Sequence, residues 1–217
     1  GPSNSFSPLP WAARLKIAQG AARGLTYIHE FSGRKYVHSN LKSTKILLDE
    51  DHNPYISGFG LTRLGIGSSN SKSPSSAPKR LSSNHSIATS AIVSIGSNVS
   101  ASSNIYLAPE ARIAGGTFTH KCDVYSFGIV LLELLTGRLS HLGAEKDGME
   151  LESFVRNAFR EEQPLSEIID PALLREVYAK KQVIAVFHVA LNCTELDPEL
   201  RPRMRTLSET LDRIKLQ

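Results

Sequence analysis

The sequence predicts a mainly helical domain of the α+β kind, with one small β-hairpin and one long inserted loop. In several segments apolar residues recur at three- and four-residue steps, the spacing that puts them on one face of a helix. Only two short runs read as strands, and a tight polar turn separates them. With 217 residues, 41% of them hydrophobic, the chain can bury one core or contribute part of a larger one.

The first expected helix begins at Trp11. Its apolar residues fall on one face, and they are Trp11, Leu15, Ala18, Ala22, Leu25 and Ile28. The expected hairpin follows, with strands at residues 45–48 and 55–57 around a polar turn at residues 49–54.

The segment from residue 65 to residue 104 is dominated by Ser, with Gly, Asn and Pro between and few large apolar side chains. Such a segment buries too little surface to offset the entropy lost on ordering. We therefore expect a long flexible loop, with order resuming at Ile105.

Four more helices are expected after this loop. The almost wholly apolar segment 123–136, closed by Gly137, predicts a buried helix. Amphipathic segments predict further helices at residues 151–160, 182–193 and 204–216. In the last of these, Leu207, Leu211 and Ile214 mark the buried face.

Composition excludes several classes of function. The net charge of +4 comes from scattered Lys and Arg, so we expect no nucleic-acid partner. Cys122 and Cys193 form no CxxC pair and the seven His are dispersed, so no metal site is predicted and a reducing compartment fits best. No apolar run approaches the ~18 residues that a membrane span needs.

Five short motifs follow one another along the chain. They read YVHSNLKSTKILL at residues 36–48, SGFG at 57–60, APE at 108–110, DVYSFG at 123–128 and RP at 201–202. The set resembles the catalytic loop HRDLKxxN, the DFG motif, the APE motif, the central buried helix and the late Arg of protein kinases. With LLTGR at residues 134–138, the chain is most similar to plant leucine-rich-repeat receptor-like kinases.

This resemblance implies a kinase-like α+β fold in which residues 1–217 form the helical C-terminal lobe with its small hairpin. Residues 65–104 are then a Ser-rich insertion in the activation segment. The small lobe, with the glycine-rich loop and the Lys that hold ATP, is expected before Gly1. No GxGxxG motif occurs in the chain itself.

The resemblance also identifies three replaced catalytic positions. Asn40 stands where kinases carry the Asp that accepts the proton of the substrate hydroxyl, and an amide cannot act as a general base. Lys45 and Gly58 stand where kinases carry the Asn and Asp that bind magnesium. An ammonium has donors only, and Gly has no side chain, so neither can ligate the metal.

Other positions match the family. Lys42 matches the loop Lys that approaches the γ-phosphate, and His38 is expected to be structural beneath the loop. Phe59 is expected to fill a slot in the core. The remaining matches are expected to be structural: Glu110 and Arg201 as a buried ion pair, and Asp123 as the acceptor of backbone hydrogen bonds from the catalytic loop.

The leading interpretation is a catalytically impaired kinase-like domain, a pseudokinase, that acts in signalling by protein interaction. A second interpretation is a weak or atypical Ser/Thr protein kinase in which Lys42 and Lys45 neutralise phosphate. A third is a degenerate gene fragment without function. No cofactor is predicted under the first interpretation, whereas ATP and magnesium belong to the second.

Partners and location follow from the resemblance. We expect protein partners, above all another receptor kinase, at the cytoplasmic side of the plasma membrane. Membrane attachment is expected only through a transmembrane segment of the parent protein outside this chain. The segment itself is expected to be soluble.

Overall fold

The computed structural model describes residues 8–31, 36–59, 105–113, 116–140, 149–176 and 179–216. The α-helices are α1 Trp11–Thr26, α4 Pro109–Arg112, α5 His120–Thr136, α7 Leu151–Arg160, α8 Leu165–Ile168, α9 Lys180–Cys193 and α10 Met204–Arg213. A π-helical turn, Tyr27–Phe31, continues α1, and 3₁₀ turns span Ser43–Lys45, Pro171–Arg175 and Pro198–Leu200. The expected loop at residues 65–104 lies outside the described residues.

The two strands form the expected hairpin. β1, Ile46–Leu48, pairs antiparallel with β2, Pro54–Ile56, and the register places Leu47 opposite Tyr55. β2 packs against α1. The hairpin turn is closed by Asp49, whose carboxylate accepts hydrogen bonds from the backbone and side chain of Asn53 at 2.8 Å each.

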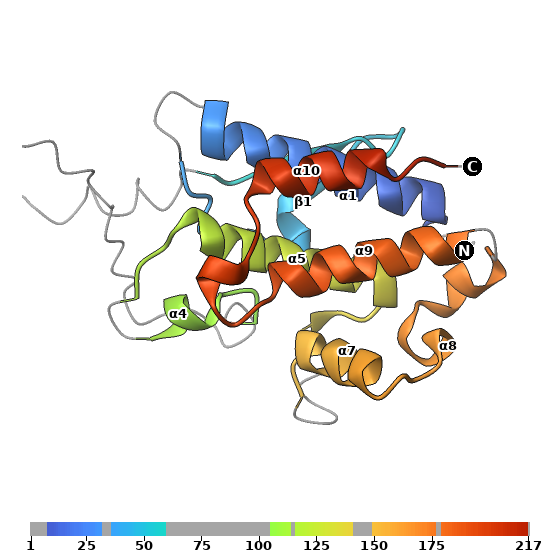
Figure 1. The fold of residues 1–217 in the computed structure, drawn as a ribbon. Coiled ribbons are helices and arrows are strands. Elements are labelled where there is room, and N and C mark those ends of the chain that lie inside the picture. Colours follow the sequence, from blue (N-terminus) through green and yellow to red (C-terminus); the bar gives the residue numbers. More distant parts are fainter. Residues whose placement is uncertain are drawn as a thin grey trace, which may run out of the picture.

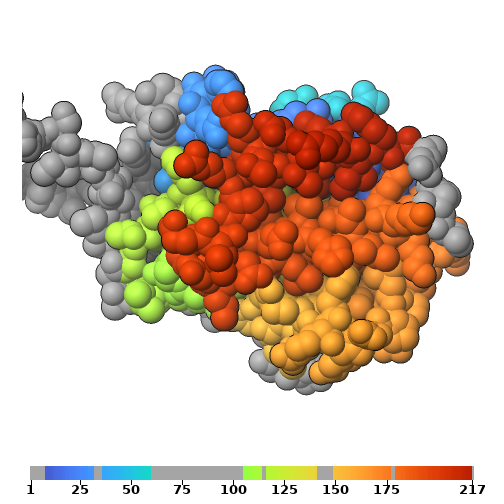
Figure 2. All heavy atoms as spheres, in the orientation of Figure 1, coloured from blue at the N-terminus to red at the C-terminus, as the bar shows by residue number. Residues whose placement is uncertain are grey.

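The long helices pack in pairs around α5. In Figure 1, α10 lies along α1 and α9 lies along α5. The space-filling view shows α9 and α10 meeting side by side (Figure 2), and contacts join α9 to α5 and α10 to α1. α5 is therefore covered by other helices, as its apolar sequence predicts.

The ends of α5 explain its length. Thr119 precedes the helix and its hydroxyl accepts a hydrogen bond from the Lys121 N–H at 3.2 Å, so α5 starts three residues before the predicted boundary.

At Gly128 an added Cβ would lie 2.6 Å from the Cβ of Cys193, because α9 approaches α5 closely there. This close contact requires glycine at position 128.

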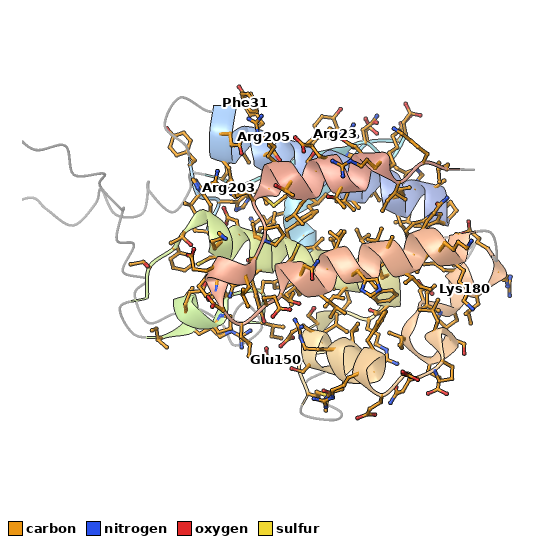
Figure 3. The ribbon with its side chains drawn as sticks, viewed as in Figure 1. Arg23, Phe31, Glu150, Lys180, Arg203 and Arg205 are labelled. Atoms are coloured by element: carbon orange, nitrogen blue, oxygen red, sulfur yellow. The ribbon has the colours of Figure 1, made fainter. Side chains whose placement is uncertain are left out.

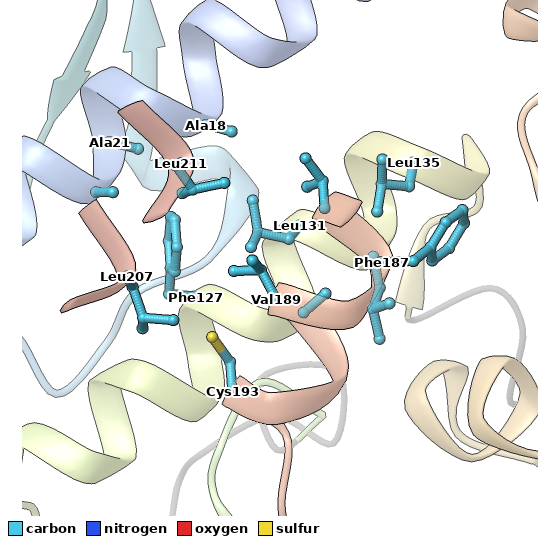
Figure 4. Packing of buried hydrophobic residues seen from close by; sticks show 14 of the residues in the cluster. Ala18, Ala21, Phe127, Leu131, Leu135, Phe187, Val189, Cys193, Leu207 and Leu211 are labelled. Carbon is cyan, nitrogen blue, oxygen red and sulfur yellow. The ribbon is translucent and has the colours of Figure 1, made fainter. Parts of the chain in front are cut away.

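The core is built from α5, α9, α10 and α1 together. Figure 4 shows Phe127, Leu131 and Leu135 of α5 interleaved with Phe187, Val189 and Cys193 of α9 and Leu207 and Leu211 of α10. The predicted apolar face of the first helix is confirmed, since Trp11, Leu15, Ala18, Ala22, Leu25 and Ile28 are all buried. A mainly helical fold with one small sheet is likewise confirmed.

One predicted core residue is wrong. The Phe59 side chain is 46% exposed, and its ring lies 6.2 Å from that of Tyr36. Phe59 lies three residues beyond the end of β2, and two residues of the hairpin, Leu47 and Tyr55, are also 55% and 58% exposed. Among the described residues, the ring of Phe59 is therefore only partly covered.

Candidate functional site

The first turn of α5 holds the catalytic-loop segment through Asp123. This buried carboxylate accepts hydrogen bonds from the backbone N–H groups of His38 at 2.6 Å and Ser39 at 2.8 Å. The ring of His29 contributes a third contact, with its Nε2 2.8 Å from Asp123 Oδ2. Hydrogen bonds to a charged acceptor are stronger than neutral ones, so Asp123 fixes where the loop begins.

His38 connects this loop to the end of β2. Its Nδ1 accepts a hydrogen bond from the Asn40 N–H at 3.3 Å, and its Nε2 lies 3.1 Å from the Ser57 carbonyl oxygen. Since Nδ1 accepts a hydrogen bond, the ring proton lies on Nε2 and the ring is neutral. The Nε2–H group then donates a hydrogen bond to the Ser57 carbonyl oxygen. Burial lowers the pKa of His38 and outweighs the opposing charge of Asp123. His38 therefore holds residues 38–40 against residue 57.

Arg201 and Glu110 form an ion pair in which the Arg201 side chain is buried and the Glu110 side chain is 27% exposed. The Nη1 of Arg201 lies 2.6 Å from Glu110 Oε1, and its Nη2 lies 2.9 Å from Glu110 Oε2. The remaining donors of Arg201 reach the backbone carbonyls of Glu195, Leu196 and Lys121. Burial raises the pKa of Glu110, but the hydrogen bonds and charge of Arg201 outweigh burial and lower it overall.

Lys45 and Gly58 meet in space, although they are separated by the whole hairpin. A Cβ added at Gly58 would lie 3.3 Å from Lys45 Nζ and 3.4 Å from Lys45 Cδ and Cε. The ammonium of Lys45 therefore lies beside the position that a side chain at residue 58 would occupy. Gly58 has φ +81°, a left-handed conformation that costs other residues strain.

The two remaining predicted catalytic positions, Asn40 and Lys42, precede Lys45 in the same loop. Asn40 is exposed, and Lys42 precedes the 3₁₀ turn that ends at Lys45, with the Lys45 N–H donating to the Lys42 carbonyl at 2.8 Å. Among the described residues, the side chains of Asn40, Lys42 and Lys45 make no hydrogen bond or ion pair. Asn40, Lys42, Lys45 and Gly58 are named the catalytic-loop end below.

Carboxylates are absent from the long stretch of sequence that follows the hairpin turn. Between Asp51 and Glu110 the sequence contains no Asp or Glu, although it contains Arg63, Lys72, Lys79 and Arg80. Asp123 is fully engaged by its three donors. In the part of the chain that the structure describes, no group of three or more His, Cys, Asp or Glu could hold a metal ion.

Sequence reasoning missed one polar connection, between Tyr106 and Glu133. The Tyr106 hydroxyl donates a hydrogen bond to Glu133 Oε1 at 2.6 Å and lies 3.1 Å from the Ser43 hydroxyl. Through these two contacts Tyr106 links the catalytic loop to α5. Burial, followed by the Glu133 contact, raises the pKa of Tyr106. The signal was present in the sequence, because Glu133 is the acidic residue that interrupts an otherwise apolar helix.

Comparison with known proteins now assigns the fold. The family described as the protein kinase domain matches residues 7–210. The chain belongs to this family.

Its relatives are plant receptor-like kinases. A protein of Arabidopsis thaliana named "probable inactive leucine-rich repeat receptor-like protein kinase" is 35% identical over 98% of the chain and 28% of its own length. A second Arabidopsis protein, named a probable leucine-rich repeat receptor-like serine/threonine-protein kinase, is 35% identical over 98% of the chain and 18% of its own length. Arabidopsis STRUBBELIG-RECEPTOR FAMILY 5 is 37% identical over 98% of the chain and 26% of its own length.

The chain thus spans less than a third of the length of these curated relatives. This kinase-family chain carries an intact set of structural contacts at Asp123, His38, Glu110 and Arg201. Of the helices in the described ranges, none is both long and apolar enough to cross a membrane.

Proposed function

We propose that this chain is the large-lobe part of a receptor-like kinase domain that has lost phosphate transfer and acts in signalling through protein contacts. The observation that carries the proposal is the meeting of Lys45 with Gly58. These two residues stand at the positions that bind magnesium in kinases, and together they offer an ammonium and no oxygen ligand.

The charge of Lys45 disfavours a divalent cation at this position. A unit charge 4 Å from another of the same sign costs roughly 4 kcal/mol at an effective dielectric constant near 20. A divalent cation placed beside Lys45 would face this cost with each of its two charges. Residues 52–109 contain no Asp or Glu that could offset this cost, and the Asp123 carboxylate is already bound by His29, His38 and Ser39.

The loss of the general base adds to this effect. Asn40 is exposed and carries an amide in place of a carboxylate. General-base catalysis contributes roughly 10²–10⁴ in rate, so replacement of this group alone would leave only slow transfer. Because the three positions act on one assembly, their effects are not additive.

The receptor setting comes from the relatives. Their printed names describe leucine-rich-repeat receptor-like kinases, and one of these names includes the word inactive. We propose that the parent protein holds this chain at the cytoplasmic side of a plasma membrane, with another receptor kinase as its partner, and the names of the relatives support this setting. The retained buried contacts of Arg201 and Asp123 support a folded lobe, which a protein-binding role needs.

The test is radiolabelled phosphate transfer from ATP in the presence of magnesium or manganese. It compares a longer polypeptide that includes the upstream small lobe with the same polypeptide carrying Asn40→Asp, Lys45→Asn and Gly58→Asp. The proposal expects transfer only from the restored version. A native polypeptide that transfers phosphate above background would refute the loss of activity and favour the weak kinase.

A further inference from the structure

An open cleft lies between the π-helical turn that follows α1, the start of α5 and the start of α10. Its volume is about 860 Å³, and residues of all three segments line it. Three lining side chains carry a positive charge at neutral pH, namely Lys121, Arg203 and Arg205. Among the described lining residues, Glu30 is the only carboxylate. With its histidines neutral, this basic cleft has an excess of two positive charges.

The cations of the basic cleft are only partly neutralised. Arg205 forms an exposed ion pair with Glu30, which occupies the one carboxylate of the cleft. The partly buried ammonium of Lys121 donates hydrogen bonds to two backbone carbonyl oxygens, which leave its charge in place. The exposed Arg203 side chain is attracted by Glu30 over a longer distance, but within the described ranges it forms no hydrogen bond or ion pair. An anionic ligand would therefore meet two cations that have no carboxylate partner.

Arg203 and Arg205 also stand at an unfavourable place for cations. Arg203 immediately precedes α10 and Arg205 lies in its first turn, close to the positive end of the helix dipole. The first turn of α10 contains no acidic residue, and the Arg203 side chain does not cap it. A negatively charged group in the basic cleft would offset the repulsion at this end of the helix.

Two exposed aromatic rings border the basic cleft. Tyr27 and Phe31 are 62% and 61% exposed, and their rings are stacked with centres 6.3 Å apart. The guanidinium carbon of Arg205 lies 5.3 Å from the centre of the Phe31 ring, so this arginine connects the rings to the cleft. Figure 3 shows Phe31, Arg205 and Arg203 near one another at the start of α10. Exposed Tyr and Phe beside Arg are typical of protein interfaces, in which these residue types are enriched.

We propose that the basic cleft and the two rings together bind an acidic segment of a partner protein. In this interaction, Asp or Glu side chains of the partner enter the cleft and form charge-assisted hydrogen bonds with Lys121 and Arg203. An apolar side chain of the same segment packs on Phe31. Complementary charge selects acidic partners and disfavours basic ones.

A peptide segment fits this surface better than a lipid surface does. Lys121 is partly buried in the cleft, where an extended Asp or Glu side chain reaches it more readily than a flat layer of headgroups. The volume of the cleft lies in the range of sites that enclose ligands of several hundred Å³. The ring of Phe31 beside the cleft adds an apolar contact that a chain of alternating side chains can use.

The inference rests on the protein-contact part of the proposed function and names the chemistry of the partner. It concerns a surface that shares no residue with the catalytic-loop end. Phosphate transfer tests the catalytic-loop end and peptide binding tests the basic cleft. Either result can therefore fail while the other stands.

The experiment is fluorescence anisotropy of a labelled peptide that carries a run of Glu beside one Phe, titrated with the 217-residue chain. Saturable binding is expected at low salt, and it should weaken as salt is raised because exposed charges are screened. The same peptide with Gln in place of every Glu is expected to bind about tenfold more weakly or worse. These two comparisons need no variant of the protein.

Two variants locate the binding surface. Arg203→Gln is expected to weaken binding about fivefold or more, the range for loss of a charge-assisted hydrogen bond. Phe31→Ala is expected to weaken binding of the Phe-containing peptide but to change little for a peptide with Ala in its place. The matched control is Lys180→Gln, which removes an exposed cation from the start of α9, away from the basic cleft in Figure 3. It should change binding less than about twofold.

Four results would overturn the inference. They are the absence of saturable binding at low salt, equal affinity for the Gln peptide, unchanged binding by an Arg203→Gln chain whose thermal transition matches the native one, and equal weakening by Lys180→Gln. Sedimentation with phosphatidylserine vesicles tests the other class of partner. If the vesicles bind through Arg203 while the peptide does not bind, the surface recognises lipid and the proposed partner is wrong.

Discussion

Two regions of the molecule differ in how their polar groups are paired. One is the set of structural contacts around Asp123 and Arg201, and the other is the catalytic-loop end. Arg201 directs its donors to Glu110 and to three backbone carbonyls, and Asp123 accepts three hydrogen bonds. A few residues after Ser39, Lys42 and Lys45 have neither hydrogen bonds nor ion pairs with the described residues. The folded state therefore depends on the first set and makes little demand on the second.

This difference separates fold from chemistry within one loop. A buried charge whose partner is removed destabilises a protein strongly, so substitutions at Glu110, Asp123 or Arg201 are costly. A partly exposed ammonium without a partner can be replaced at little cost in stability. Substitutions at the two sets should therefore have effects of very different size.

The largest expected effect is that of Arg201→Met. It leaves the partly exposed Glu110 carboxylate and three backbone carbonyls without their donor, and we expect a loss of about 3 kcal/mol in the free energy of unfolding. Urea unfolding at neutral pH measures it. The matched control is Arg205→Met, which breaks the exposed pair with Glu30 and should cost about 1 kcal/mol or less. If both variants lost the same free energy of unfolding, Arg201 would contribute no more to stability than an exposed ion pair, which would contradict the expected difference.

Gly58→Ala has the next largest expected effect. At φ +81° a Cβ costs about 1–2 kcal/mol of backbone strain, and unfolding measurements should show this loss. The nearest atoms belong to the flexible end of Lys45, so crowding contributes little. A double variant with Lys45→Ala separates the two causes. If Lys45→Ala restores stability, the loss comes from crowding and the strain argument is wrong.

His38 is expected to make stability depend on pH. Its folded pKa is lowered, so the unfolded chain binds a proton more readily than the folded one. The contribution of neutral His38 is full above the unfolded pKa of about 6.5 and is lost as pH falls from there toward the folded pKa. Titration of the His38 ring proton by NMR, in the folded chain and in urea, checks the sign. A higher midpoint in the folded chain would contradict it.

The smallest expected effect is that of Lys45→Asn. Since the ammonium has no partner among the described residues, the free energy of unfolding should change by about 0.5 kcal/mol or less. The same unfolding measurement as for Arg201→Met gives the comparison directly. A loss as large as that of Arg201→Met would show that Lys45 is a structural residue.

Much of the fold was predictable from the sequence. Residues 151–160 were expected to be helical, and α7 has these bounds; β1 and β2 each begin within one residue of the predicted strands. α10 ends at Arg213, three residues before the predicted end, because Ile214 has left helical geometry. Periodicity locates buried faces well, but the ends of helices depend on local caps such as Thr119.

The candidate site was less accessible to sequence reasoning. The replaced positions could be identified by motif, but the contact between Lys45 and Gly58 depends on the closure of the hairpin. The exposure of Phe59 depends on which elements pack against its ring, which apolarity alone does not reveal. Tyr106 was missed because its partner, Glu133, lies 27 residues away on another element.

The most direct test of the account is broadening of amide NMR signals by manganese, which detects even weak metal binding. In the native chain we expect broadening of Asp51, at the acidic turn, before Gly58 or His38. In the chain with Lys45→Asn and Gly58→Asp, we expect residues 38 and 58 to broaden at lower manganese concentrations than in the native chain. Broadening at Gly58 and His38 first in the native chain would show that the catalytic-loop end still holds metal, and would contradict the account.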